Sequence, residues 1–262
     1  MKNSVLIVVP TLGERIQMLE ECLDSLVLQN GLTTIVVIYP QKSQPNILEI
    51  IKKFPTVIFE AQDLKMIDSV NYAFQKYRDH EFANWLGDDD LLTSGSIRRI
   101  LQMFEENPEI IGVFGGCDYI DEAGFRIATY NPPKFAAKLC GFIPAAIKLE
   151  GGLFRLGELL SAGGIDPIFR YCPDIDVTLK LRRRGRWSKV SGPPVSNFRI
   201  HSDSVTALGR RSGMREARQI QYKYGNKLEK SLVFTVGLIV QEAKVAIFYI
   251  TEKFHKVRGF GL

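Results

Sequence analysis

The sequence has little cysteine and histidine, and several common motifs are missing from its 262 residues. The four cysteines, Cys22, Cys117, Cys140 and Cys172, form no CxxC pair and have no metal-ligand spacing. They therefore argue against a zinc ribbon or a disulfide framework and predict reduced, mostly buried thiols in a cytosolic protein. The first apolar run, residues 5–9, is too short for a signal peptide. The sequence also has no P-loop, no GxGxxG fingerprint and no internal repeat.

The positive charge is concentrated in one part of the chain. The formal net charge is +5, but residues 199–262 contain twelve Lys/Arg and five Asp/Glu, a net of +7, which leaves −2 for residues 1–198. An apolar content of 45% and an aromatic content of 10% are ordinary for a globular protein with a substantial core. The composition therefore predicts one large domain, or one domain with a basic C-terminal appendage.

Short apolar segments alternate with helical patterns through the first half of the chain. Residues 4–9 form a continuous apolar run that should be buried on both faces of a sheet, and residues 16–29 show helical spacing. The same reasoning predicts strands at 34–39, 56–60 and 82–86 and helices at 46–54 and 66–77. Strands that alternate with helices predict an α/β fold with a mostly parallel, nucleotide-binding type of sheet flanked by helices.

Three consecutive aspartates, Asp88, Asp89 and Asp90, follow the expected strand at 82–86. Mutual repulsion makes such a cluster costly unless a cation or water screens it. Mg²⁺ and Mn²⁺ bind carboxylate oxygens and commonly share their shell with substrate phosphates. The end of a strand is also where ligands bind in open α/β sheets. The simpler alternative is a solvated acidic turn that caps the helix beginning near residues 93–96.

Three segments of residues 4–92 carry a specific resemblance. They are Pro10 and Thr11 with Arg15 before a helix that ends in Ser-Leu-Val-Leu-Gln (25–29), the segment 63–71, and the segment 85–92. Together they resemble the N-terminal half of glycosyltransferase family 2, whose members are inverting enzymes with a GT-A fold. The resemblance implies that the donor is bound by Pro10, Thr11, Arg15, Asp68, Asn71, Asp88 and Asp89. It implies that Asp89 approaches the ribose and Asp90 holds Mg²⁺ or Mn²⁺, although Asp88 and Asp90 could instead form the DxD pair.

Two departures from the family pattern concern the nucleotide. Family members usually carry an aspartate at the end of the second strand, whereas Tyr39 and Pro40 occupy that turn here. Lys65 also replaces the glycine of the third segment. Recognition of the base is therefore expected to differ from that of typical members, while the metal aspartates are retained.

The second half continues the resemblance. Residues 111–121 predict a strand that leaves the metal site, with a hairpin turn at 122–124, and residues 151–155 resemble the strand that floors the acceptor site. Residues 159–166 resemble the family's leucine-rich helix, and residues 174–185 resemble its catalytic segment. The resemblance makes Asp174 the general base, although Pro173 stands where the family usually has glutamate.

Inverting transfer needs such a carboxylate, because a base must act on the acceptor hydroxyl on the face of the sugar opposite the departing nucleotide. In the simpler interpretation Asp174 only caps the helix that starts at residues 175–177, and it could do both. The segment 198–206 resembles the family segment whose histidine often completes the metal shell. This implies that His201 is a metal ligand or phosphate contact; otherwise it is an ordinary histidine, like His80 and His255.

After residue 206 the resemblance ends. We therefore expect a catalytic domain over residues 1–208 and a basic, amphipathic helical region over residues 209–262. A helix drawn through residues 231–253 has a broad apolar face, but Gln241, Glu242 and Lys244 interrupt it. Charged residues at bilayer depth cost about 2.5–3.5 kcal/mol each, which argues against a membrane span. The apolar face could pack on the catalytic domain, form a homodimer with a second subunit, or contact a membrane surface.

These observations predict a metal-dependent, inverting glycosyltransferase of the hexosyltransferase class. It would transfer sugar from a nucleoside-diphosphate sugar donor to a saccharide or lipid-linked saccharide acceptor in cell-surface polysaccharide or glycolipid synthesis. We expect it in the cytoplasm, peripherally at the inner membrane face. The alternative is a nucleotide-sugar binding module without turnover, which would not need both the base and the metal aspartates. No nucleic-acid partner is expected, because the basic tail shows no recognised motif.

Overall fold

The structure is a computed structural model that describes residues 4–29, 31–144, 146–201 and 209–232. The helix predicted for 231–253 lies, from residue 233 on, outside the described residues. The helices are α1 (Ile16–Val27), α2 (Gln44–Lys53), α3 (Met66–Lys76), α4 (Ser96–Glu106), α5 (Ala136–Leu139), α6 (Leu156–Ser161), α7 (Pro173–Arg182), α9 (Arg210–Tyr224) and α10 (Lys227–Leu232), with a 3₁₀ turn η1 (Gln41–Ser43).

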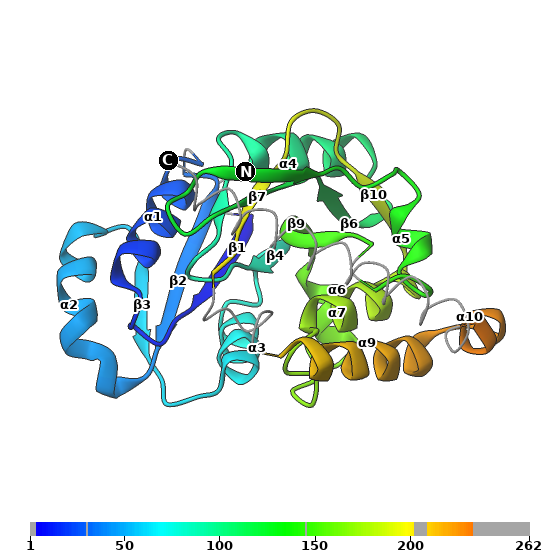
Figure 1. The fold of residues 1–262 in the computed structure, drawn as a ribbon. Helices are drawn as coiled ribbons and strands as arrows, with labels where there is room; N and C mark the ends of the chain where they lie inside the picture. The colour runs from blue at the N-terminus through cyan, green and yellow to red at the C-terminus, as the bar shows by residue number, and fades with distance from the viewer. Residues whose placement is uncertain (1–3, 30, 145, 202–208, 233–262) are drawn as a thin grey trace, which may run out of the picture.

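A seven-stranded sheet runs through the centre of the molecule in the order β10-β6-β9-β4-β1-β2-β3 (Figure 1). Its strands are β1 (Val5–Pro10), β2 (Thr33–Tyr39), β3 (Ile58–Ala61), β4 (Phe82–Trp85), β6 (Ile110–Gly115), β9 (Lys148–Arg155) and β10 (Arg186–Lys189). β1 pairs in parallel with β2 and β4, and β2 with β3, whereas β9 is antiparallel to both β4 and β6. The predicted fold class, an α/β fold with a largely parallel sheet flanked by helices, is confirmed.

A second, four-stranded sheet has the order β5-β11-β7-β8. Its strands are β5 (Leu91–Leu92), β7 (Cys117–Ile120), β8 (Arg126–Tyr130) and β11 (Ser196–Arg199). The single strand predicted for 111–121 is therefore wrong, because β6 and β7 belong to different sheets with Gly116 between them. A Cβ at Gly116 would lie 3.3 Å from the Tyr130 carbonyl oxygen, so a larger residue at this crossing would have to displace the neighbouring strand by a few tenths of an ångström.

Helices cover both faces of the central sheet, and β1 shows how the sequence encodes this. Val5, Ile7 and Val9 face the core formed with α1, α2 and α4, whereas Leu6 and Val8 face the core formed with α3, α6 and α7. The alternation follows the two-residue period of a strand, and both faces are apolar because both are covered. Because the helices cover the two faces, the carboxyl ends of the central strands β1 and β4 are left uncovered.

The first helices of the basic C-terminal region pack against the rest of the protein. Ala217 and Ile220 of α9 are buried in the same core as α7, and α9 lies beside α7 in Figure 1. Gln221 donates to the Cys140 carbonyl oxygen at 3.0 Å, and Arg182 of α7 forms an ion pair with Glu229 of α10 at 2.7 Å. Within the described parts of the chain, no helix is both long and apolar enough to cross a membrane.

Candidate active site

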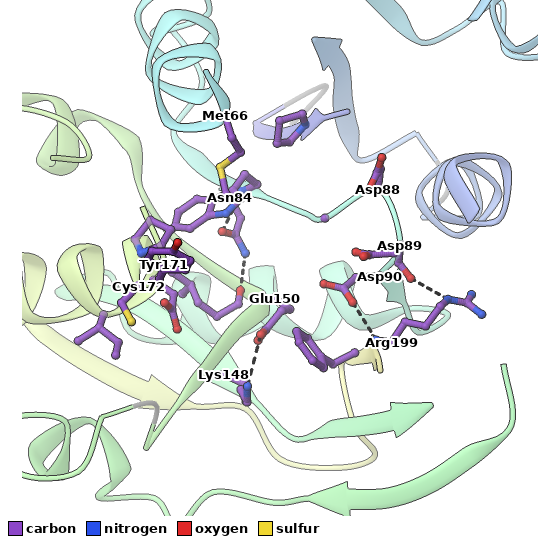
Figure 2. Close-up of a pocket in the computed structure, with 18 of the residues that line it drawn as sticks. Met66, Asn84, Asp88, Asp89, Asp90, Lys148, Glu150, Tyr171, Cys172 and Arg199 are labelled. Carbon is purple, nitrogen blue, oxygen red and sulfur yellow. Dashed lines mark hydrogen bonds and ion pairs between the residues drawn. The ribbon is translucent and has the colours of Figure 1, made fainter. Parts of the chain in front are cut away.

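A cavity of about 340 Å³ opens at the carboxyl ends of β1 and β4. Side chains from four separated segments line it, as Figure 2 shows in part. They come from the end of β4 and the loop after it (Asn84, Trp85 and residues 87–90), the start of β9 (148–150), the segment entering α7 (170–175) and the end of β11 (Phe198 and Arg199). Pro10, Arg15 and Met66 also line the cavity. The fold thus brings the predicted metal aspartates and the predicted base to one cavity.

Asp88 is held by the loop that follows β1. Thr11 Oγ1 donates to Asp88 Oδ2 and Arg15 Nη2 donates to Asp88 Oδ1, each at 2.5 Å. Burial raises the pKa of Asp88 and outweighs the opposing effect of Arg15. The three residues were predicted to bind the donor together, and the structure places them in mutual contact.

Asp89 faces Arg15 and His201. Its Oδ2 lies 2.8 Å from His201 Nε2 and 3.3 Å from Arg15 Nη1. The His201 imidazole thus contacts the carboxylate next to Asp90, and the Asp89 side chain is 15% exposed. The role of His201 as a metal ligand or phosphate contact stays a prediction.

Asp90 is buried beside Arg199. The Arg199 backbone amide donates to Asp90 Oδ1 at 2.9 Å, while its guanidinium binds the Asp89 carbonyl oxygen at 2.9 Å and Glu21 at 2.6 Å. Arg199 is only 1% exposed, so it fixes the aspartate loop from within the protein. Burial, the neighbouring Asp89 and then Glu150 raise the pKa of Asp90 well above its usual value. Arg199 lies in the segment 198–206, in which only His201 was predicted to have a role.

The carboxylates suit a divalent cation that shares its ligands with a substrate. Among the described residues, no group of three or more His, Cys, Asp or Glu side chains is arranged to hold a metal ion by itself. Mg²⁺, however, is commonly bound through one or two carboxylates together with substrate phosphates. Asp89 and Asp90 provide crowded carboxylate oxygens. The pKa of Asp90 is raised first by burial and then by the charges of Asp89 and Glu150, and a cation would offset these charges.

Asp174 lies in the first turn of α7 and lines the same cavity. The helix begins at Pro173, earlier than predicted, and the residue at its cap position is Cys172, with no side-chain capping bond. Asp174 therefore does not occupy the cap position considered for it. Burial, strengthened by the charge of Glu150 and opposed by Lys148, raises the pKa of Asp174 to about 6.

Lys148 and Glu150 were missed by sequence reasoning. They sit two residues apart on one face of β9 and line the cavity, with 3.6 Å between the Lys148 ammonium and Glu150 Oε1. The ammonium also lies 4.7 Å from the ring centre of Phe198, and Glu150 Oε2 is buried with no hydrogen-bond partner. Burial alone would lower the pKa of Lys148, but Glu150 and the other nearby anions raise it. The sequence pattern that could have indicated this pair is a lysine and a glutamate two positions apart in an otherwise apolar strand, a spacing that places both side chains on one face.

Three predicted donor residues, Thr11, Asp68 and Asn71, are not among the residues that line the cavity, and of these Thr11 contacts the cavity residue Asp88. Asn71 on α3 donates to the Ile165 carbonyl oxygen at 2.8 Å and accepts from the Ile165 amide at 2.9 Å. Its amide group therefore joins α3 to the turn after α6. Asp68 lies in the first turn of α3, two residues from Met66, which lines the cavity. Donor contact by all three residues stays a prediction.

The turn after β2, where the family's usual acid is absent, contacts a different carboxylate. The Gln41 backbone amide donates to Asp63 Oδ1 at 2.9 Å. Asp63 belongs to the loop between β3 and α3, and it is exposed. A carboxylate is therefore present near the end of β2, although it comes from the loop that follows β3.

The fold and cavity define a nucleotide-binding type of α/β protein with converging carboxylates. Residues 6–152 match the model of the family described as "Glycosyl transferase family 2". This match covers more than half of the chain, and the protein belongs to this family. No curated protein matched the chain.

Solved structures with the same fold are GT-A glycosyltransferases. Residues 1–349 of S. aureus TarS align with a TM-score of 0.63 and 15% identity, over 89% of this chain and 69% of that one; the same TarS segment has also been solved with UDP. The chain covers 41% of the longer TarS structure. The mannosyltransferase PcManGT from Pyrobaculum calidifontis, solved with GDP-Man and Mn²⁺, aligns with a TM-score of 0.65 and 13% identity, over 99% and 80%.

Proposed function

We propose that the protein is a metal-dependent, inverting glycosyltransferase that moves a sugar from a nucleoside-diphosphate sugar to an acceptor hydroxyl. The observation that carries this proposal is the convergence of Asp88–Asp90 and Asp174 on one cavity from separate segments of the chain. A module that only binds a nucleotide sugar needs Asp88–Asp90 but not Asp174. A further carboxylate from a separate segment has a use when an acceptor must be deprotonated.

The donor would lie across the aspartate loop. Arg15 and Thr11 hold Asp88, and Arg199 holds Asp90, so the loop is fixed before any ligand binds. We extend the metal site predicted for Asp90 and His201 to Asp89, because Asp89 directly precedes Asp90 in the chain and contacts His201. These three residues would hold Mg²⁺ or Mn²⁺ together with the donor diphosphate. A cation bound there would stabilise the negative charge that develops on the leaving diphosphate.

Asp174 would accept the proton of the acceptor hydroxyl. As that oxygen forms its bond to the anomeric carbon, the bond from this carbon to the diphosphate oxygen breaks, and the diphosphate leaves with the bonding electrons. Attack opposite the leaving group inverts the anomeric configuration. With a pKa of about 6, most Asp174 carboxyl groups are ionised at pH 7, yet they are better proton acceptors than an ordinary aspartate.

The donor would be a UDP or dTDP sugar in preference to a GDP sugar, and the acceptor a saccharide or lipid-linked saccharide. Because TarS has been solved with UDP and PcManGT with GDP-Man, both nucleotides belong in the first screen. The pathway would be cell-surface polysaccharide or glycolipid synthesis at the inner membrane face. The exposed Arg211, Arg215 and Lys227 of the C-terminal region support contact with an anionic surface.

The test is release of nucleoside diphosphate from UDP-, dTDP- and GDP-sugars in the presence of Mn²⁺ or Mg²⁺, first without and then with saccharide acceptors. A glycosyltransferase releases nucleoside diphosphate slowly without acceptor, and this release should stop in EDTA. Proton NMR of the new glycosidic bond then reports its configuration relative to the donor. Binding without release from any donor would support the binding module, and retention of configuration would refute inversion.

A further inference from the structure

The segment that leads into α7 has an irregular backbone, yet it carries five successive residues of the cavity wall. Arg170, Tyr171, Cys172, Pro173 and Asp174 all line the cavity, and the first three precede the helix. Backbone amides in an irregular, partly buried segment need hydrogen-bond partners outside regular secondary structure. What binds these amides therefore decides where Asp174 is held.

One carboxylate from the C-terminal region binds all three amides. Glu216 on α9 accepts from the Arg170 amide at 3.1 Å through Oε1, and from the Tyr171 and Cys172 amides at 2.6 Å and 3.2 Å through Oε2. Hydrogen bonds to an ionised acceptor are roughly twice as strong as neutral ones. Glu216 itself does not line the cavity, so its contacts with the segment are not contacts with a substrate.

α9 is fixed well enough to act as a support. Ala217 and Ile220 anchor it in the core beside α7, and Lys223 forms an ion pair with Asp166 at 2.7 Å. The Cys172 thiol donates to the Gly213 carbonyl oxygen at 3.2 Å, which adds a second link between α9 and the same segment. α9, itself anchored in the core, therefore binds the backbone of residues 170–172, immediately before Asp174.

We propose that Glu216 is a positioning residue that holds residues 170–172 so that Asp174 faces the acceptor side of the cavity. The inference rests on the proposed function for its catalytic consequence, because it takes Asp174 as the base. It assigns the first helix of the basic C-terminal region to the active site, although that region lies beyond the match to the family model. The contacts themselves do not depend on the identity of donor or acceptor.

The structural half of the proposal can be tested without a substrate. Glu216→Ala removes the acceptor, Glu216→Gln keeps the shape but only one acceptor oxygen, and Gln219→Ala changes an exposed residue of the same helix as the control. Hydrogen–deuterium exchange should become faster in residues 170–174 for E216A, less so for E216Q, and should not change for Q219A. Mass spectrometry after iodoacetamide treatment should show faster labelling of Cys172 in E216A, with Cys22 and Cys117 unchanged.

The catalytic half is tested by release of UDP from UDP-glucose and of GDP from GDP-mannose with Mn²⁺. Misplacing a catalytic group by an ångström can cost 10²-fold, so E216A should lower kcat about 10–100-fold while KM for the donor changes less than about threefold. If Glu216 acts through Asp174, the double variant E216A/D174N should be no slower than D174N. A merely structural residue would instead slow D174N further and weaken donor binding.

Unchanged exchange in residues 170–174 of E216A would overturn the proposal, as would a normal kcat in E216A or a fully additive loss in the double variant. Wild-type protein that releases nothing from either donor would count against the proposed function for those donors. Exchange and thiol labelling would still decide whether Glu216 holds the segment, so the two failures are distinguishable.

Discussion

Arg15 Nη2 donates to Asp88 Oδ1 at 2.5 Å, so a protein cation already pairs with the first of the three aspartates. Thr11 occupies the other oxygen of the same carboxylate. Asp88 therefore fixes the aspartate loop to the loop after β1 with both of its oxygens. Arg15 lies farther from Asp89, with 3.3 Å between Nη1 and Oδ2, so Asp89 and Asp90 are the better candidates for binding a cation. This difference separates the two registers in which the aspartates can be aligned with a DxD motif.

Asp90→Asn should remove the effect of Mn²⁺ on UDP binding, because one of the two carboxylates that would share the cation with the diphosphate is lost. Isothermal titration calorimetry with and without Mn²⁺ measures this effect. Asp88→Asn is the matched variant: it should weaken UDP binding in both conditions but leave the enhancement by Mn²⁺ in place. Loss of the enhancement in D88N as well would favour the register in which Asp88 and Asp90 hold the metal.

Asp174→Asn should lower turnover by about 10²–10⁴-fold, the usual contribution of a positioned base. Asparagine keeps the shape of the side chain but cannot accept the proton. UDP binding should change little, because the aspartate loop is held by Arg15 and Arg199 instead. Single-turnover release of nucleoside diphosphate measures the effect, and near-normal turnover in D174N would exclude Asp174 as the base.

Asp176, two residues after Asp174, is the other carboxylate of this segment that could act as the base, and its environment differs from that of Asp174. It is fully buried, where it accepts from the Asp166 amide and from Lys180, both at 3.0 Å. It does not line the cavity. Asp176→Asn is therefore a control whose main expected effect is a lower Tm.

The sheet and the aspartate cluster could be predicted because their signals are local. A continuous apolar strand followed by three carboxylates is visible within a dozen residues, and the alternation of strands and helices limits the topology. β7 and β11, by contrast, pair residues about 80 positions apart, as Cys117 with Ser196. No short-range pattern indicates such a pairing, so the second sheet was not predicted.

Single-residue roles were harder to predict for the same reason. Donor contact by Asn71 stays a prediction from its motif, and the motif did not indicate that its amide binds Ile165, a residue 94 positions away. Glu216 appears in the sequence as one acid in a basic stretch, and only the fold shows that it binds three amides before α7. The family motifs predicted which segments meet at the site. The direction of each side chain depends on contacts with residues far away in the sequence.

The C-terminal region should bring the protein to anionic membranes. Basic residues near such a surface contribute about 1 kcal/mol each, and this attraction weakens as salt screens it. Flotation with vesicles that contain phosphatidylserine should recover the full chain in low salt and lose it in 0.5 M NaCl. A chain that ends at residue 231 is the control, and full-length protein that never floats would indicate that the region packs or pairs with protein.

Two cavity residues should shift the pH profile in opposite directions. Asp174 must be ionised to act as a base, so kcat should rise with pH through about 6 and level off above it. Glu150 raises the pKa of Asp174 and Lys148 lowers it. Glu150→Gln should therefore move the rising limb to lower pH, and Lys148→Met should move it to higher pH. If both variants shift the profile in the same direction, the rise of kcat with pH does not reflect the ionisation of Asp174.

The last prediction concerns stability. Asp174 has a raised pKa in the folded protein, which means that its ionised form is less favourable there than in the unfolded chain. The cost is absent below the usual aspartate pKa, where the group is protonated in both states. It grows as pH rises from about 4 and is complete above about 6. A position in the first turn of a helix normally favours a carboxylate, so the raised pKa shows that burial and the charge of Glu150 outweigh the helix dipole.

Asp174→Asn should therefore raise Tm at pH 8 and change it little at pH 4. In a chain of this size, about 1 kcal/mol corresponds to a shift of roughly 2–4 °C, which differential scanning calorimetry resolves. Asp176→Asn provides the contrast, since breaking its contacts with Lys180 should lower Tm. If D174N lowers Tm at pH 8, Asp174 stabilises α7 as a charged residue of its first turn. The ionised carboxylate would then be favoured by the fold, and the expected rise of kcat through pH 6 would have to come from another group.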